Sequence, residues 1–172
     1  MTFNVVSAVE LIRSSPSVPT ARSANYFPFP GAARTLATMP IVGHGIDIVE
    51  TARIRKLVEQ HGPHFLDRVF TAAEQRYCAA SPKRYFEHLA GRFAAKEAVL
   101  KVLGTGWRGG IAWTDIEVVK ESSGQPRIVL TGECLRIANE RGIAHWHVSI
   151  SHIETHATAS AIGLRKAADG TI

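Results

Sequence analysis

Apolar residues between Ser81 and Gly104 recur at the spacing of one long helix. Serine is a favoured helix N-cap, and Pro82 suits the first helical position because the N–H that it lacks has no partner there. Glycine readily adopts the left-handed conformation that ends helices, so Gly104 predicts the C-terminus. At about 100° per residue, one narrow stripe forms that we expect to face the core. Its members are Phe86, Ala90, Phe93, Glu97, Leu100 and Gly104.

Glu97 is a carboxylate in the middle of this apolar stripe. An unpaired charge buried there would cost several kcal/mol, comparable to the stability of a whole domain. One interpretation is a surface ion pair with Lys101, one turn further on, worth about 0.3–0.5 kcal/mol. The other is a site for a hard cation beside an anion, where Glu97 binds the metal and Lys101 the phosphate. We favour the second interpretation because the flanking residues are so apolar.

Residues 41–50 form the first predicted strand, because aliphatic residues alternate along them. We place Ile46 and Ile48 on one face and Asp47 on the other. Gly45, with a second glycine two residues earlier, weakens the strand, so we expect something to approach its backbone closely. Asp47 has three possible interpretations: a helix cap, a solvent-facing strand residue or a functional carboxylate.

Residues 51–61 predict a short helix that ends at Gly62-Pro63. Its inner side is aliphatic, whereas Arg53, Arg55 and Lys56 form a basic outer side. Such a run is usually a solvated face, and it also suits docking of an acidic partner.

The remaining pattern alternates helices with short strands. The sequence Thr-Ala-Ala-Glu at 71–74 is a capping box that opens a helix to about residue 79, and residues 65–70 connect it to the helix before. A helix at 132–140, with Leu135 inside, separates a hairpin from a final strand pair. Short connections favour antiparallel pairing, so we predict an α+β fold in which an antiparallel sheet packs against one long helix. The later strands are expected at 115–120, 126–130, 145–152 and 155–164.

Residues 1–38 differ from the rest of the chain. They are rich in Ser, Ala, Pro and Arg, and Glu10 is their only acid. We predict a disordered extension at 1–38, one folded domain at 39–166 and a frayed C-terminus at 167–172. Because the first strand follows directly, we expect Met39 to be the natural start.

Composition bounds the class of protein. The chain of 172 residues is 45% hydrophobic with a net charge of +5, and its pI of about 9.6 suits anionic partners. No apolar run approaches about 18 residues, so we expect no membrane span and no membrane partner. Cys78 and Cys134 have no metal-binding spacing and are interpreted as buried thiols of a reducing compartment, the cytoplasm.

Three signals carry chemistry: Asp47, the pair of Glu97 and Lys101, and His152 after Ser151 at a strand end. The sequence contains neither a Walker phosphate loop nor a GxGxxG motif after a strand. Two carboxylates distant in sequence suit Mg²⁺, which prefers few protein carboxylates together with waters and phosphate oxygens. A lysine beside them suits a pyrophosphate substrate. The residues alone therefore predict a metal-assisted reaction at a phosphate.

Six blocks occur in order along the chain: Gly45-Ile-Asp-Ile-Val-Glu50, Phe70-Thr-Ala-Ala-Glu74, Arg92-Phe-Ala-Ala-Lys-Glu-Ala98, Gly104-Thr-Gly106, Asp115-Ile-Glu-Val118 and Ser149-Ile-Ser-His152. Together they resemble the holo-[acyl-carrier-protein] synthases, the small bacterial class of 4′-phosphopantetheinyl transferases. The resemblance runs from about Met39 to Leu164. It implies transfer of phosphopantetheine from coenzyme A to a serine of acyl carrier protein, with release of adenosine 3′,5′-bisphosphate, in support of fatty acid biosynthesis.

The resemblance also implies roles for individual residues. The metal ligands would be Asp47 and Glu97, holding Mg²⁺, and with Lys101 on the phosphates they would form the catalytic set. Coenzyme A would be bound by Arg92, Lys101, Gly104 and His152. The acidic helix of the carrier would meet Arg53.

The resemblance further implies a homotrimer with the active site at the seam between subunits. The general base stays open between Asp47, Glu97 acting through water, and His152. There are three departures from the family pattern: His44, where a small or aliphatic residue is common, residues 153–156, and a basic helix with fewer arginines than in some relatives. Rival functions are a Mg²⁺-dependent nucleotide phosphohydrolase and a basic nucleic-acid-binding module. Since the aromatic residues follow core patterns, we expect no nucleic acid partner.

Overall fold

The computed structural model of the chain describes residues 41–106 and 110–165. They all belong to one compact unit that spans residues 36–172. The extension predicted at 1–38, the start proposed at Met39 and the C-terminus at 167–172 lie outside the described residues.

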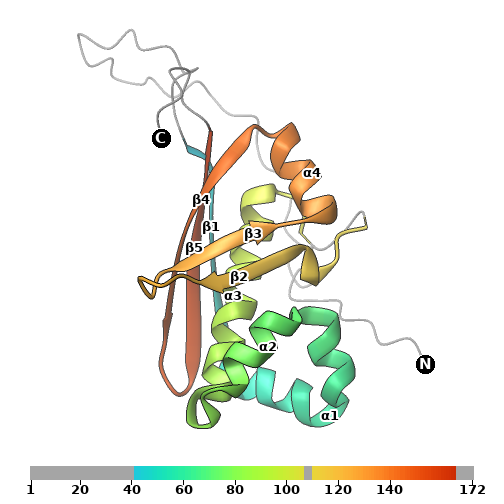
Figure 1. The fold of residues 1–172 in the computed structure, drawn as a ribbon, viewed down its shortest axis with the longest axis vertical. Helices are drawn as coiled ribbons and strands as arrows, with labels where there is room; N and C mark the ends of the chain where they lie inside the picture. Colours follow the sequence, from blue (N-terminus) through green and yellow to red (C-terminus); the bar gives the residue numbers. More distant parts are fainter. Residues whose placement is uncertain (1–40, 107–109, 166–172) are drawn as a thin grey trace, which may run out of the picture. The chain divides into compact units, whose positions relative to one another are not determined.

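A three-stranded antiparallel sheet forms one layer, with strand order β1 (Ile41–Glu50), β5 (His156–Arg165) and β4 (Ile143–His152). Helix α3 (Tyr85–Leu103) packs along one face of this sheet (Figure 1). The central strand presents only small side chains to the helix, which lets the two backbones come close; these are Ala157, Ala159 and Ala161, all buried. The fold is the predicted α+β arrangement of an antiparallel sheet on one long helix.

Glycine in β1 allows α3 to lie directly on the strand. A Cβ atom at Gly45 would overlap the carbonyl oxygen of Ala98, and one at Gly43 would lie 3.2 Å from that of Val102. The close approach predicted at these glycines is thus confirmed, and the approaching group is the helix backbone. On the opposite face of β1, Ile46 is 59% exposed and Ile48 is 68% exposed.

Helix α3 begins later than the sequence predicted. Residues Pro82–Arg84 form a separate 3₁₀ turn, closed by a bond from the amide of Arg84 to the carbonyl of Ser81 at 3.0 Å. The Ser81 side chain makes no capping bond, so the predicted N-cap is wrong, because the chain tightens into i→i+3 bonds before the α-helix starts. The predicted end is confirmed: Gly104 has φ of 68°.

Helix α1 (Thr51–Val69) continues beyond the predicted stop. Gly62, with φ of 50° and ψ of −132°, kinks the chain, and helix resumes with Pro63. Proline suits the first turn of a new helix because no amide is needed there. The residues expected to be a connector are therefore helical, and they bury Phe65 and Val69 against the core.

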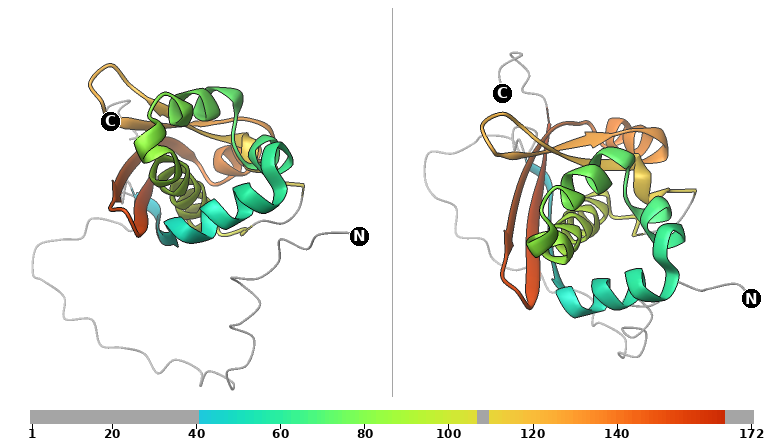
Figure 2. Two further views of the ribbon diagram at one scale, coloured as in Figure 1. Left: turned by 90° about the horizontal axis from the view of Figure 1, so that it is seen from below. Right: turned by 60° about the horizontal axis from the view of Figure 1, so that its bottom comes forward.

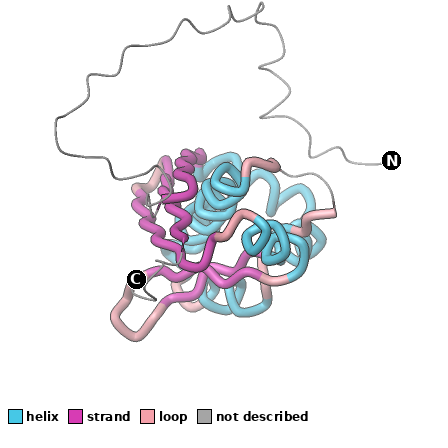
Figure 3. The backbone as a smooth tube through the Cα atoms, turned by 90° about the horizontal axis from the view of Figure 1, so that it is seen from above, coloured by secondary structure: helices cyan, strands magenta, loops and turns pink. Residues whose placement is uncertain are grey.

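The other elements confirm most of the predicted pattern. Helix α2 (Ala72–Ala79) opens with the expected capping box, and strands β2 (Ile116–Lys120) and β3 (Pro126–Leu130) form the hairpin after a 3₁₀ turn, η4 (Trp113–Asp115). Helix α4 (Gly132–Glu140) buries Cys134 but leaves Leu135 43% exposed, so Leu135 was placed wrongly. Helices α1 and α2 pack on α3 (Figure 2), and the helices gather beside the sheet (Figure 3).

A buried ion pair that the sequence did not reveal lies in this core. Lys96 of α3 is 0% exposed, and its Nζ atom lies 2.8 Å from Oε2 of Glu74 on α2. The same ammonium donates to the carbonyl oxygens of Val69 at 2.8 Å, Trp113 at 3.1 Å and Ile116 at 2.6 Å. Burial lowers the pKa of Lys96, and the Glu74 carboxylate opposes that shift. One side chain thus ties α1, α2, η4 and β2 to α3.

Candidate active site

Asp47 and Lys101 meet where β1 crosses α3. The Nζ atom of Lys101 donates to Oδ1 of Asp47 at 2.9 Å and to the carbonyl oxygen of Ile46 at 2.6 Å. The Asp47 backbone is held from the next strand, where the Thr158 hydroxyl donates to its carbonyl at 2.8 Å. The lysine therefore pairs with the aspartate, and not with Glu97 one turn away on its own helix.

Glu97 completes this group as a partly buried carboxylate. Burial raises its pKa first, the nearby Asp47 carboxylate raises it further, and the Lys101 and Arg53 cations act in the opposite direction. These four charged groups share one electrostatic neighbourhood, although they come from β1, α1 and α3. Burial, together with the Asp47 carboxylate, thus outweighs the two cations that favour the charged form of Glu97.

The donor set fits a hard divalent cation. No cluster of three or more His, Cys, Asp or Glu side chains suited to a metal occurs among residues 41–106 and 110–165. Two carboxylates without further protein ligands match Mg²⁺, which retains waters and binds substrate phosphate oxygens. The partly buried charge of Glu97 beside Asp47 is what such a cation would neutralise. Asp47 and Glu97 are thus the residues that could hold a divalent cation such as Mg²⁺ at this place.

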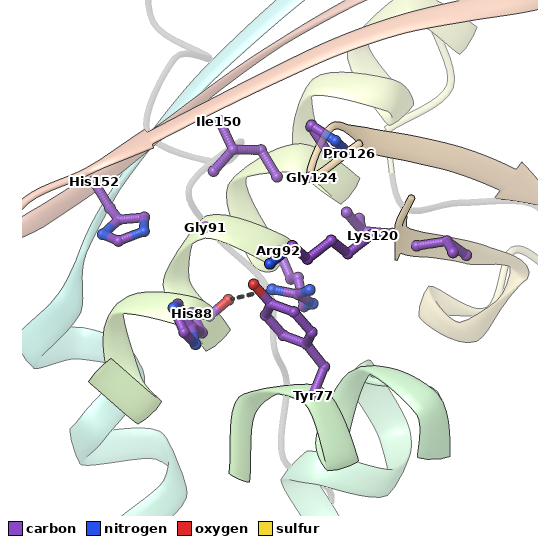
Figure 4. Close-up of a pocket in the computed structure, with 11 residues that line it drawn as sticks. Tyr77, His88, Gly91, Arg92, Lys120, Gly124, Pro126, Ile150 and His152 are labelled. Carbon is purple, nitrogen blue, oxygen red and sulfur yellow. Dashed lines mark hydrogen bonds between the residues drawn. The ribbon is translucent and has the colours of Figure 1, made fainter. Parts of the chain in front are cut away.

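A second group of side chains lines a cavity of about 170 Å³ between α3, β4 and the β2–β3 hairpin (Figure 4). Arg92 is only 6% exposed. Its guanidinium lies 3.8 Å from the ring centroid of Tyr77, and Nη1 reaches the His88 carbonyl at 3.5 Å. Its Nε is buried and has no protein partner in the described part of the chain. The Nζ atom of Lys120 also lies 5.7 Å from the centroid of the Tyr77 ring. Arg92 and Lys120 therefore offer the cavity N–H donors for an anion.

His152 enters the same cavity from the end of β4. Its Nδ1 atom lies 3.0 Å from Oε2 of Glu87, and its ring meets that of His88 edge-on at 5.6 Å. Burial lowers the pKa of His88, and the positive charge of Arg92 lowers it further. The cavity is thus lined by two histidines, one of which has a carboxylate partner.

The two groups lie at opposite edges of the sheet. Asp47 is on β1 and His152 on β4, with β5 between them, which puts the outer strands about 10 Å apart. The charged groups that shift the pKa of Glu97 are Asp47, Lys101 and Arg53. Those that shift the pKa of His88 are a different set: Arg92, His152, Arg84 and Glu87. Within one chain the structure therefore brings together Asp47, Glu97, Lys101 and Arg53, but it does not bring Arg92 or His152 to them. Gly104 lies at the end of α3, one turn beyond Lys101.

Three polar lining residues escaped the sequence reasoning, Tyr77, His88 and Lys120. Glu87, which does not line the cavity but bonds to His152, escaped it too. Tyr77 and Lys120 come from α2 and β2, so only the packing of the hairpin over α3 brings them to Arg92. Glu87 lies five residues before Arg92 on α3, and no spacing in the sequence linked it to His152, 65 residues further along the chain.

The described part of the chain contains no helix that is both long enough and apolar enough to cross a bilayer. Both cysteines are buried and free, as predicted.

Comparison with known proteins gives one consistent result. The holo-[acyl-carrier-protein] synthase of Koribacter versatilis is 47% identical over 122 residues, which cover 71% of this chain and 97% of that protein. The crystal structure of the Neisseria meningitidis synthase superposes with a TM-score of 0.65 at 34% identity, covering 72% of this chain and 98% of that one. The Helicobacter pylori synthase in complex with coenzyme A matches with a TM-score of 0.61 at 32% identity, covering 70% and 98%. A family model of the 4′-phosphopantetheinyl transferase superfamily matches residues 43–161. The chain therefore belongs to the 4′-phosphopantetheinyl transferase superfamily.

Proposed function

We propose that this protein is a holo-[acyl-carrier-protein] synthase, which transfers 4′-phosphopantetheine from coenzyme A to a serine of apo-acyl carrier protein. The observation that carries the proposal is the crowded pair Asp47 and Glu97 beside Lys101, inside the segment that matches the family. The relatives bear the name of this activity, and one of them was crystallised with coenzyme A. The activity would serve fatty acid biosynthesis in the cytoplasm.

In the reaction, the serine oxygen forms a bond to the phosphorus nearer the pantetheine, and the bond from that phosphorus to the leaving adenosine 3′,5′-bisphosphate breaks. Asp47 and Glu97 would hold Mg²⁺ at the diphosphate. When bound, the cation would neutralise charge on the phosphate. Lys101, oriented by its bonds to Asp47 and the Ile46 carbonyl, would neutralise charge on the leaving phosphate.

The serine proton goes to a base that stays open between Asp47, Glu97 acting through a water molecule, and His152. Arg92 and His152, which line the cavity between α3, β4 and the β2–β3 hairpin, would bind coenzyme A. Gly104, which has no side chain, would let this ligand pass close to the end of α3. Arg53 would contact the acidic helix of the carrier. It lies exposed on α1 together with Arg55 and Lys56, as a docking surface requires.

A homotrimer would complete the site. One chain keeps the Asp47 group and the Arg92 group at opposite edges of its sheet, so that a neighbour's Arg92 group could face the Asp47 group across a subunit seam. The exposed Ile46 and Ile48 on the outer face of β1 support burial against another copy.

Mixing tests this arrangement. Asp47→Asn and Arg92→Ala are each expected to inactivate the protein, and mixed trimers refolded from both are expected to regain activity because some seams carry neither substitution. A monomer by sedimentation, or mixtures as inactive as the parents, would contradict it.

The decisive experiment combines the protein, coenzyme A, Mg²⁺ and an apo-carrier, and then measures the intact mass of the carrier. We expect a mass gain of one phosphopantetheine, abolished by EDTA. Free phosphopantetheine with unmodified carrier would indicate a hydrolase instead. Salt-sensitive binding to random DNA without coenzyme A binding would indicate a nucleic-acid-binding module.

A further inference from the structure

A carboxylate outside the proposed metal pair contacts the imidazole in the Arg92 cavity. Glu87 lies in the first turn of α3, and its Oε2 atom is 3.0 Å from Nδ1 of His152, 65 residues further along the chain. Both side chains are shielded, with 17% of Glu87 and 22% of His152 exposed. A hydrogen bond in such a place holds its geometry better than one at the open surface.

Two contacts restrict the ring of His152. A carboxylate accepts, so the bond to Glu87 requires a proton on Nδ1. The ring of His88 packs edge-on against it, with the planes at 77°. Turning the imidazole over would place a carbon atom against the carboxylate and lose the bond. Nε2 is thus the ring nitrogen left for a ligand, and within the described residues no protein group forms a hydrogen bond with it.

We propose that Glu87 is a positioning residue for the transfer reaction. It fixes the orientation of His152 and keeps the proton on Nδ1, so that Nε2 is the atom presented to coenzyme A in the cavity (Figure 4). The inference rests on the proposed function, because it takes the cavity to be part of the coenzyme A site. Pairs of this kind, in which a carboxylate orients a working histidine, are a recurrent device in enzymes.

Other charged groups near the pair do not replace Glu87. Nε of Arg84 lies 3.8 Å from the same carboxylate oxygen, but Arg84 is 62% exposed, so this ion pair is weak. His88 meets His152 only through an edge-on ring contact, and neither His88 nor Arg92 forms a hydrogen bond with the His152 ring in the described part of the chain. Removing Glu87 should therefore leave Nδ1 without its partner.

Steady-state kinetics with apo-carrier test the proposal. Glu87→Ala is expected to raise KM for coenzyme A about tenfold with kcat changed less, the usual effect of losing one charge-assisted bond. Glu87→Gln should stay within about threefold of wild type, since the amide oxygen still accepts from Nδ1. In a His152→Ala background, Glu87→Ala should not raise KM for coenzyme A any further, because Glu87 acts through the His152 ring. Glu140→Ala, which removes an exposed partner of Arg136 on α4, is the matched control and should leave KM unchanged.

Nitrogen-15 NMR of labelled histidine gives a readout that does not depend on turnover. The neutral His152 ring should carry its proton on Nδ1 in wild type and in Glu87→Gln, and a mixture of tautomers should appear in Glu87→Ala. Unchanged tautomers in Glu87→Ala, or equal losses from Glu87→Ala with and without His152, would overturn the proposal. If wild type fails to modify the carrier, the proposed function fails, and the NMR result still decides whether Glu87 positions His152.

Discussion

Removing the charge of Lys96 should strongly destabilise the fold. In Lys96→Met the side chain keeps a similar length and apolar stem, but the ammonium is lost. The carbonyls of Val69, Trp113 and Ile116 then lose a buried donor. Glu74, 1% exposed, loses its countercharge.

The magnitude depends on the groups that lose their partner. Breaking a buried ion pair by removing one partner typically costs about 3–5 kcal/mol, and each orphaned buried acceptor adds to the loss. Glu74 keeps two amide donors, Thr71 at 2.9 Å and Val118 at 3.0 Å, which limits the loss. We therefore expect a decrease of about 3–5 kcal/mol in the free energy of unfolding, a large part of the roughly 5–15 kcal/mol of an ordinary domain.

Urea unfolding followed by circular dichroism at one fixed protein concentration measures this decrease, because assembly adds to apparent stability. Glu74→Gln in the Lys96→Met background should cost far less than in wild type, since the charge it removes is by then unpaired. Arg127→Met, which breaks an exposed pair with Glu121, is the control and should cost at most about 1 kcal/mol. A loss below about 1 kcal/mol for Lys96→Met, or additive effects of the two core substitutions, would refute the reasoning.

Three further predictions concern Glu97, Gly45 and the two buried cysteines. Glu97→Gln should abolish carrier modification at any Mg²⁺ concentration. It should also slightly raise the melting temperature without metal, because it removes a charge that is partly buried and lies near the Asp47 carboxylate. Mg²⁺ with coenzyme A should then stabilise wild type only, and near-normal turnover of the variant would contradict the metal site. Gly45→Ala should destabilise the fold by about 1–3 kcal/mol by pushing β1 off Ala98, and an unchanged urea midpoint would contradict that packing. Burial raises the pKa of Cys78 to about 11 and of Cys134 to about 12, from 9.0. Their stabilising contribution is therefore complete below pH 9 and lost as pH rises through those values, and iodoacetamide at pH 8 should label them in urea but not in the native state.

Local signals predicted most elements well. Strand β1 has the expected bounds, and the capping box, the hairpin and the end of α3 at Gly104 are confirmed. Apart from the burial of Leu135, the main misses occurred beside two prolines. Pro63 opens a new helical segment where a stop was expected, and Pro82 opens a 3₁₀ turn instead of α3. Proline shows where helical bonding is interrupted, but the conformation of the residues after it depends on how they pack.

The candidate site, too, was predicted only in part from the sequence. The sequence identified Asp47, Glu97 and Lys101 and placed the last two on one helix. It could not show that Lys101 binds Asp47, 54 residues away, since that contact exists only because two glycines let β1 lie on α3.

By itself, then, the sequence determined most of the secondary structure and the family, and it named residues of the candidate site, because periodicity and short motifs act over neighbouring positions. Only the tertiary structure decided the buried partner of Lys96, the contact of Glu87 with His152, and the separation of the Asp47 and Arg92 groups to opposite sheet edges. The reason is that the packing of distant segments sets how deeply each charge is buried and which countercharge it meets.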